Sequence, residues 1–196
     1  MSIKAGLIEE LEKIRDFRTG KGRRHPLWLV LLLVIMGTMS GYIGYRGLGD
    51  FVKRHKQSLI EILEIPKKRV PSYSTIRRVM MRVDFEELTQ VFNYWASEYV
   101  ELNSSEWLAT DGKSIKATVC DYSSSYQTFV SVVSVFSNKQ GLVVGLKAMD
   151  NKQTSEITTV QNLITLLDLK DVVFSFDALH CQKKPLNKLS TVAMIM

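Results

Sequence analysis

The sequence predicts an α/β protein whose first part, residues 1–103, is all helical and whose second part, residues 104–196, forms a sheet. In the first part, apolar residues recur at spacings of three and four, which is the period of an amphipathic helix. In the second part, runs rich in β-branched and aromatic residues are separated by turn compositions such as "CDYSSSY" and "NKQ". Hydrophobic residues make up 45% of the chain, which excludes wholesale disorder.

The first predicted helix lies in "SIKAGLIEELEKIRDFRTG" and ends near Gly20. Its expected inward residues are Ile3, Leu7, Leu11, Ile14 and Phe17. A basic loop, "KGRRHP", then leads into an apolar helix. One or two mixed helices follow in "YRGLGDFVKRHKQSLIEILEIPKK", where glycines and a proline mark the breaks.

The apolar stretch from Leu27 to Tyr45 carries no charge and follows "KGRRH". Its length and positive flank meet the criteria for a membrane span. Glycine and hydroxyl residues dilute its second half, which leaves a strongly apolar core of about ten residues, closer to a buried helix than to a full span. A buried helix is therefore the preferred interpretation, and a small membrane protein spanning residues 27–45 is the alternative.

Two consecutive helices are predicted in "VPSYSTIRRVMMRVDFEELTQVFNYWASEYV". Ser74 or Thr75 is expected to cap the first, and Asp84 with Glu87 resembles a capping box at the start of the second. The expected buried positions are Ile76, Val79, Met80 and Val83 in the first helix and Leu88, Val91, Phe92 and Trp95 in the second.

Four strands and one helix are predicted in the second part. "WLATDGKSIKATV", "QTFVSVVSVFS" and "GLVVGLKAMD" are joined by short links, which suggests an antiparallel meander. "TSEITTVQNLITLLDL" has an apolar helical stripe, and "DVVFSF" is a continuous apolar run typical of a strand buried on both faces. This β-β-β-α-β order is the opening of a ribonuclease-H-like fold, so a partial catalytic domain of that kind is expected.

Two aspartates are candidate metal ligands. Asp111 lies in the middle of the first predicted strand and Asp177 at the end of the fourth. In a mixed sheet where the fourth strand returns beside the first, the two carboxylates become neighbours. Such a pair needs a divalent cation between the charges, and its hard oxygen ligands favour Mg²⁺ or Mn²⁺. The competing interpretation is that both are solvated acids at the rim of the sheet.

Three sequence motifs resemble those of DDE-class transposases of bacterial insertion sequences, in the H-repeat-associated (ISAs-type) branch. The family's Asp-Gly-Lys strand, its Asp-Ala-x-x-x-Gln-Lys segment and its Pro-Ser-x-x-Thr-x-x-Arg-Val stretch have counterparts here. The matching residues are Asp111, Gly112 and Lys113; Asp177, Ala178, Gln182 and Lys183; and Pro71, Ser72, Thr75, Arg78 and Val79. The resemblance covers about residues 5–184.

The resemblance implies that Asp111 and Asp177 are catalytic and hold two metal ions, Mg²⁺ or Mn²⁺, that support DNA cleavage and strand transfer. The implied partner is double-stranded DNA, both transposon ends and target. Homo-oligomerisation stays open, and no small-molecule substrate is expected. In the family a glutamate from a downstream helix completes the site, whereas here "PLNKLSTVAMIM" follows Lys184. We therefore expect a C-terminally truncated, inactive chain. A non-catalytic fragment that binds DNA or a full-length transposase is the alternative.

Basic residues around the start of one predicted helix are candidate DNA contacts, in keeping with the net charge of +6. These candidates are Lys67, Lys68, Arg69, Arg77, Arg78 and Arg82, with Lys113 beside the first aspartate. An ordinary solvated face explains them equally well. Two widely spaced cysteines form neither a disulfide framework nor a zinc motif, which favours the cytoplasm.

Overall fold

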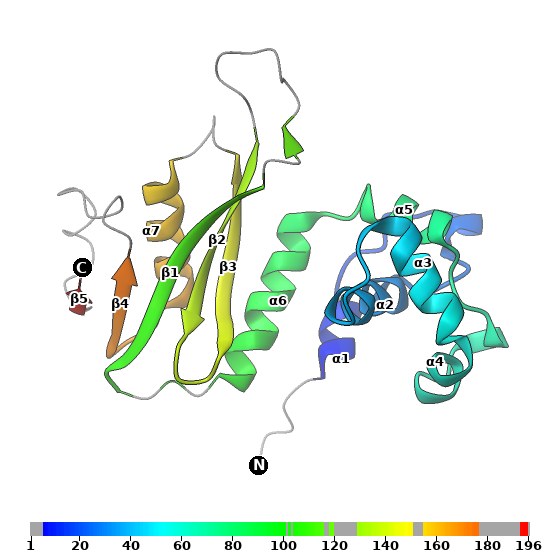
Figure 1. The fold of residues 1–196 in the computed structure, drawn as a ribbon, viewed down its shortest axis with the longest axis horizontal. Coiled ribbons are helices and arrows are strands. Elements are labelled where there is room, and N and C mark those ends of the chain that lie inside the picture. Colours follow the sequence, from blue (N-terminus) through cyan, green and yellow to red (C-terminus); the bar gives the residue numbers. More distant parts are fainter. Residues whose placement is uncertain are drawn as a thin grey trace. The chain divides into compact units, whose positions relative to one another are not determined.

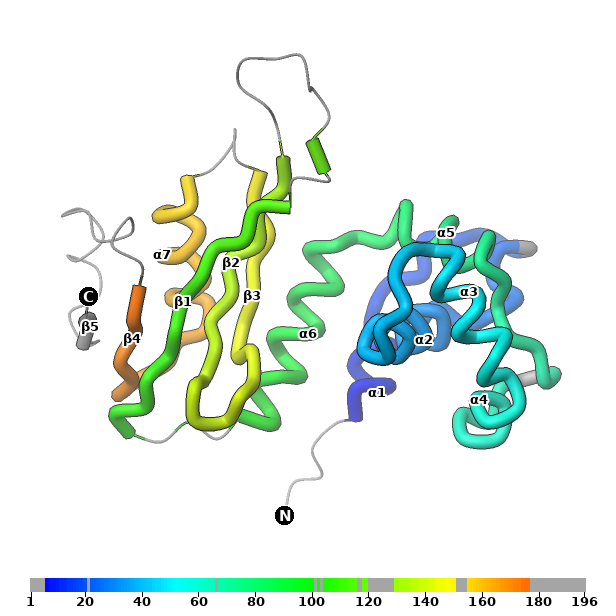
Figure 2. The backbone as a smooth tube through the Cα atoms, viewed as in Figure 1, coloured from blue at the N-terminus to red at the C-terminus, as the bar shows by residue number. Residues whose placement is uncertain are grey.

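The computed structural model describes residues 6–100, 102, 104–115, 118–119, 129–150, 155–176 and 193–195. The chain divides into two compact units: a helical unit, Ile3–Val91, and a sheet unit, Phe92–Met196. The division falls inside helix α6 (Phe85–Tyr99), and each unit has its own hydrophobic core (Figures 1 and 2). The boundary expected from the sequence, between residues 103 and 104, remains a prediction.

The helical unit packs around α2 (Leu27–Met39), which is apolar on all sides and therefore suits a fully enclosed position. Five consecutive residues of α2, from Leu29 to Leu33, are buried. Around it lie α1 (Leu7–Glu12), α3 (Gly44–Arg54), α4 (Lys56–Ile62) and α5 (Tyr73–Met80), with 3-10 turns at Gly20–Arg23 and Pro66–Lys68.

No single described helix is long and apolar enough to cross a membrane. The consecutive helices α2 and α3 reach that length and composition only as a pair, and their axes are bent by 98°. The turn between them depends on Gly41, whose φ of +82° lies in the left-handed region that favours glycine. There the amide of Tyr42 donates to the carbonyl of Gly37, which ends α2.

Glycine also permits the contact between α3 and α5. A Cβ atom at Gly49 would lie 2.6 Å from the Cβ of Tyr73 and 3.2 Å from its Cα. Because the obstructing atoms include backbone, they cannot move aside cheaply. At Gly47, two residues earlier on the same helix, the nearest atom to such a Cβ would be 3.8 Å away.

The first predicted helix was too long, because α1 ends at Glu12. The Asp16 carboxylate accepts hydrogen bonds from the amide and the guanidinium of Arg18, and this local turn replaces helical hydrogen bonds. Phe17 nevertheless packs against the core and Ile14 is buried, as expected. Ile3 lies outside the described residues.

The predicted caps are partly wrong. Helix α5 begins one residue after Ser72, not at Ser74 or Thr75. At α6, the Asp84 carboxylate accepts hydrogen bonds from the amides of Glu86 and Glu87, as a cap should. The capping box is not closed, because the Glu87 carboxylate accepts from the amide of Arg15 instead.

The sheet unit contains the strands β1 (Glu106–Ile115), β2 (Val130–Ser137), β3 (Leu142–Asp150), β4 (Val172–Phe176) and β5 (Ala193–Ile195), with α7 (Glu156–Leu167) before β4. The sheet order is β3-β2-β1-β4-β5. As predicted, β1, β2 and β3 form an antiparallel meander, and β4 returns beside β1 in parallel. The short β5 was not predicted.

Helix α7 packs against the sheet, and helix α6 binds the edge strand β3. Helix α7 packs Val160, Leu163 and Ile164 against Leu108 of β1 and the strands beside it. Strand β3 is an edge, and the Asn93 side chain of α6 binds it. The Asn93 amide donates to the carbonyl of Leu146 and accepts from the amide of the same residue, each at 2.9 Å.

Candidate functional site

Asp111 lies on the central strand β1, opposite Ser134 of β2, and is exposed. The last described pair between β1 and β4 is Thr110 with Phe176. Asp111 is the next residue on β1, and Asp177 is the next residue in sequence after Phe176. Asp177 itself lies outside the described residues, as do the two cysteines, Cys120 and Cys181.

Asp111 and Glu156 lie on opposite sides of the β1 backbone. A Cβ atom at Gly112 would meet Glu156 Oε1 at 1.6 Å, so the Glu156 carboxylate lies against the α7 side of this strand. Successive strand residues point to opposite faces, which directs Asp111 to the other side. The position of Glu156 in the first turn of α7 is explained by the favourable interaction of an acid with the helix dipole.

Of the two aspartates proposed as metal ligands, Asp111 is the one that the structure describes. Its carboxylate makes no hydrogen bond or ion pair with another described residue. Within the described ranges, no group of three or more His, Cys, Asp or Glu side chains is arranged to hold a metal ion. Lys113 lies two residues further along β1, so it shares the face of Asp111, and it is exposed.

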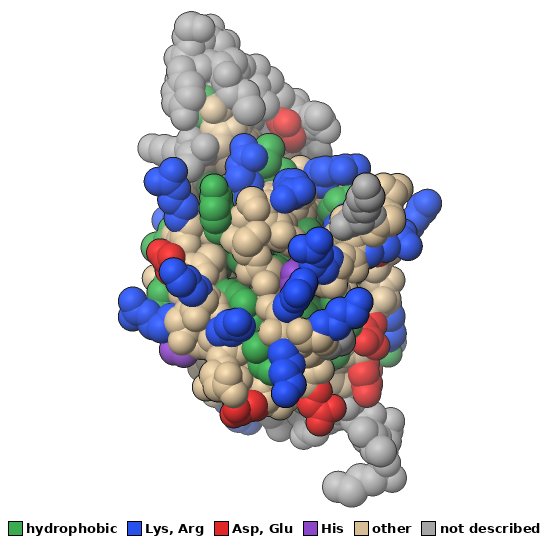
Figure 3. All heavy atoms as spheres, turned by 90° about the vertical axis from the view of Figure 1, so that its right-hand side faces the viewer, with side chains coloured by type: hydrophobic (Ala, Val, Ile, Leu, Met, Phe, Trp, Pro, Cys, Tyr) green, Lys and Arg blue, Asp and Glu red, His purple; other side chains and the backbone are tan. Residues whose placement is uncertain are grey.

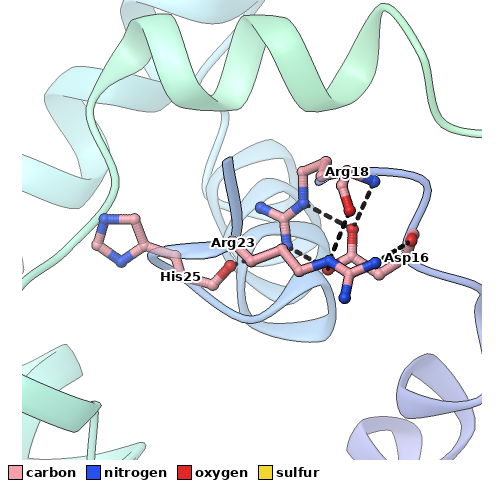
Figure 4. A network of polar contacts seen from close by, with 4 residues as sticks. All are labelled: Asp16, Arg18, Arg23 and His25. Atoms are coloured by element: carbon pink, nitrogen blue, oxygen red, sulfur yellow. Dashed lines mark hydrogen bonds and ion pairs between the residues drawn. The ribbon is translucent and has the colours of Figure 1, made fainter. Parts of the chain in front are cut away.

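A second candidate site lies in the helical unit and includes the loop of residues 16–25, four residues of which are shown in Figure 4. The Arg18 side chain is only 7% exposed. Its guanidinium donates to both carboxylate oxygens of Asp16 at 2.8 Å and to the carbonyl of His25 at 2.8 Å. The Arg23 guanidinium donates to the carbonyls of Asp16 and Arg18, which holds the turn in shape. Arg18 Nη1 is buried and has no hydrogen-bond partner among the described residues.

The charges of this loop shift the pKa of two of its members. Hydrogen bonds from the Arg18 side chain lower the pKa of Asp16, with smaller contributions from the Arg18 amide and from the charges of Arg18 and Arg23, while burial acts the other way. Burial lowers the pKa of His25, and the neighbouring charges of Arg24 and Arg18 lower it further. His25 is therefore neutral in the folded chain at pH values where an unfolded imidazole is already protonated.

Acidification is expected to destabilise the chain through His25. As the pH falls below 6.5, the unfolded chain takes up a proton that the folded chain does not, so the free energy of unfolding decreases until the lowered pKa is passed. Urea unfolding at pH 7.5 and pH 5.5 should show a smaller loss for His25→Gln than for the parent. Equal losses in the parent and in His25→Gln would contradict the assignment.

The loop forms one wall of a groove of about 1360 Å³ within the helical unit. Helix α3 and the segment from Arg69 through α5 supply the other walls. Among the described residues that line it, one is an acid, Asp50, and eight are Lys or Arg: Arg18, Arg24, Arg46, Lys53, Lys56, Arg69, Arg78 and Arg82. Figure 3 shows Lys and Arg side chains crowded on the face of the molecule that it presents, with several acids near the lower margin.

Three of the seven basic residues proposed from the sequence line this groove, namely Arg69, Arg78 and Arg82. Lys67, Lys68 and Arg77 are exposed but do not line it. Sequence reasoning missed the contribution of α3, although its lining cations, Arg46 and Lys53, are seven residues apart and therefore share a helix face. The 17–25 loop also lines the groove, and no local sequence pattern predicts that this loop lies near α3.

Known proteins resemble this chain in sequence. Residues 8–96 match the family model DDE_Tnp_1-associated. The chain is 29% identical over 184 residues to "H repeat-associated putative transposase YhhI" of Escherichia coli (strain K12), covering 93% of this chain and 47% of that protein. It is also 29% identical over 184 residues to "H repeat-associated putative transposase YbfD" of the same strain, covering 93% of this chain and 71% of that protein. The chain thus spans about half the length of YhhI.

Among solved structures, a cryo-EM structure of a piggyBac transposase synaptic complex with hairpin DNA matches 96% of this chain and 45% of its own. The sequences are 10% identical and the TM-score is 0.46, which is too low to support an argument about this chain.

Proposed function

We propose that the chain acts in the DNA transposition of an insertion sequence. The proposal starts from the similarity of its sequence to the transposase-associated family model and to two putative transposases. The observation that carries this proposal is the position of Asp111 on the central strand, one residue beyond the last described pair with β4. A ribonuclease-H-like sheet is part of the proposal. The strand order and the mixture of antiparallel and parallel pairs support it.

Asp111 and Asp177 are the proposed ligands of Mg²⁺ or Mn²⁺, and double-stranded DNA, as transposon ends and target, is the proposed substrate. The proposal requires the β1–β4 register to continue by one residue, so that the two carboxylates become neighbours. The exposed Asp111 carboxylate, with no partner among the described residues, is free to bind a cation. Divalent ions held by such carboxylates activate the attacking oxygen and stabilise the leaving oxygen of a phosphodiester displacement.

Strand cleavage and transfer are proposed for the whole enzyme, in which the family resemblance calls for a glutamate in addition to Asp111 and Asp177. The cytoplasmic location expected from the cysteine pattern remains a prediction.

Calorimetric titration of Mg²⁺ or Mn²⁺ into the purified chain tests the site. The parent is expected to bind the ion, and Asp111→Asn/Asp177→Asn is expected to lose that binding because both oxygen ligands become neutral amides. A matched control, Glu9→Gln/Glu12→Gln, removes the same charge from α1 and should bind as the parent does. Circular dichroism first establishes that each variant is folded.

Two outcomes would refute the metal site: no binding by the folded parent, or equal binding by the parent and the double aspartate variant. In either case the second candidate function, DNA binding without catalysis, would be favoured. The basic groove of the helical unit supports that candidate, since its lining residues are independent of the two aspartates.

A further inference from the structure

We propose that the groove of the helical unit, which Arg18 helps to line, binds the phosphodiester backbone of duplex DNA. The choice of DNA rests on the proposed function, whereas the anionic chemistry of the ligand follows from the groove itself. All the described residues that line the groove belong to the helical unit, and Asp111 is not among them.

Charge is concentrated in this groove far beyond the average of the chain. The whole sequence has 26 Lys and Arg against 20 Asp and Glu, while the groove has eight against one. Five lining residues make no side-chain hydrogen bond or ion pair within the described part of the chain: Arg24, Arg46, Lys53, Lys56 and Arg69. Cations that converge on one groove without internal partners repel one another, and a polyanion relieves that repulsion.

The Arg18 guanidinium in the groove is held in place by the protein and is not simply a solvated charge. Its guanidinium is held by Asp16 and by the carbonyl of His25, so its orientation is fixed before any ligand arrives. Nη1 remains without a partner although it is buried, and leaving such a donor unsatisfied is costly. The Arg18 side chain is therefore held in one orientation in the lining of the groove.

Along each of the two walls, the sequence separation of the cations places them on one side of the wall. Arg46 and Lys53 lie on one face of α3, about 10 Å apart along its axis. Arg78 of α5 and Arg82 just beyond it are four residues apart, so they fall on the same side of the opposite wall. Since a duplex rises about 3.4 Å per nucleotide along each strand, each wall can contact two or three consecutive phosphates. The start of α5, at Ser72 and Tyr73, adds the positive end of a helix dipole.

Neighbouring residues on the same helices provide a matched test. Lys53 and Arg78 line the groove, whereas Arg54 and Arg77, the adjacent residues on α3 and α5, do not. Binding of a fluorescently labelled duplex of arbitrary sequence is measured by anisotropy over a range of salt concentrations. We expect Lys53→Gln/Arg78→Gln to weaken binding at least tenfold at about 0.1 M salt and to reduce the salt slope by about 2, one for each lost phosphate contact.

The control, Arg54→Gln/Arg77→Gln, removes the same charge from the same two helices and should bind within about twofold of the parent. Equal weakening by both double variants would show a general charge effect and overturn the proposal. Polyglutamate competing as effectively as unlabelled duplex would also overturn it, by assigning the groove to an acidic polypeptide.

The failure of this proposal and that of the metal site are distinguishable. Asp111→Asn/Asp177→Asn should bind duplex as the parent does, and Lys53→Gln/Arg78→Gln should bind Mg²⁺ as the parent does. A parent that binds metal but no DNA would refute the groove alone. A parent that binds DNA through the groove but no metal would refute the carboxylate site alone.

Discussion

Replacing Gly49 with alanine is expected to lower the free energy of unfolding of the helical unit by about 2 kcal/mol, the range typical of overpacked contacts. The new methyl group would lie 2.6 Å from Tyr73 Cβ and 3.2 Å from its Cα, so α3 and α5 must separate. Urea unfolding followed by circular dichroism measures the loss. Faster hydrogen exchange in peptides covering α3 and α5 would locate it.

Gly47→Ala is the matched control on the same helix. Its methyl group meets no atom closer than 3.8 Å, and alanine is the better helix former, so the free energy of unfolding should rise by roughly 0.5–1 kcal/mol. If both variants were stabilised, the close approach of α3 and α5 would be wrong.

The second large effect is expected at Asn93. Asn93→Ala removes both the donor and the acceptor that satisfy the backbone of Leu146, and it leaves two polar groups unpaired on the edge of the sheet. The expected decrease in the free energy of unfolding of the sheet unit is about 2 to 3 kcal/mol. Hydrogen exchange should become faster in peptides covering β3 and stay unchanged in those covering α2.

Asn162→Ala serves as the control, because Asn162 is an exposed residue of α7. Its stability should change by no more than a few tenths of a kcal/mol. An Asn93 variant as stable as this control would show that the bidentate contact with β3 contributes nothing.

Much of the fold was predictable because it follows from local periodicity. The runs that became β1 to β4 and the apolar stripe of α7 have the alternation or spacing that their elements require. The end of α1 was misjudged because the Asp16 side chain forms a local turn that the apolar spacing does not predict. The start of α5 was misjudged because Ser72, Ser74 and Thr75 are all suitable cap residues and the sequence does not distinguish them.

The two candidate sites also differ in how far the sequence alone predicts them. Asp111 could be singled out because an acid in the middle of an apolar strand is unusual, and β1 is indeed the strand that pairs with β4. The groove could not be derived, since its cations come from three segments that meet only after folding. Arg18 is the clearest example, because an arginine next to a predicted helix end looks solvated until burial and the contact with His25 are seen.

Because β1 pairs with β4, the pairing of β1 cannot be completed until late in the synthesis of the chain. The central strand β1 emerges from the ribosome well before β4, because the meander and α7 lie between them. Until β4 arrives, one side of β1 has unsatisfied backbone groups and is open to pairing with other chains. The core residues of the helical unit all precede this interval, so that core can close first. Aggregation during synthesis is therefore expected to begin from β1 and to be sensitive to how fast residues 116–176 are translated.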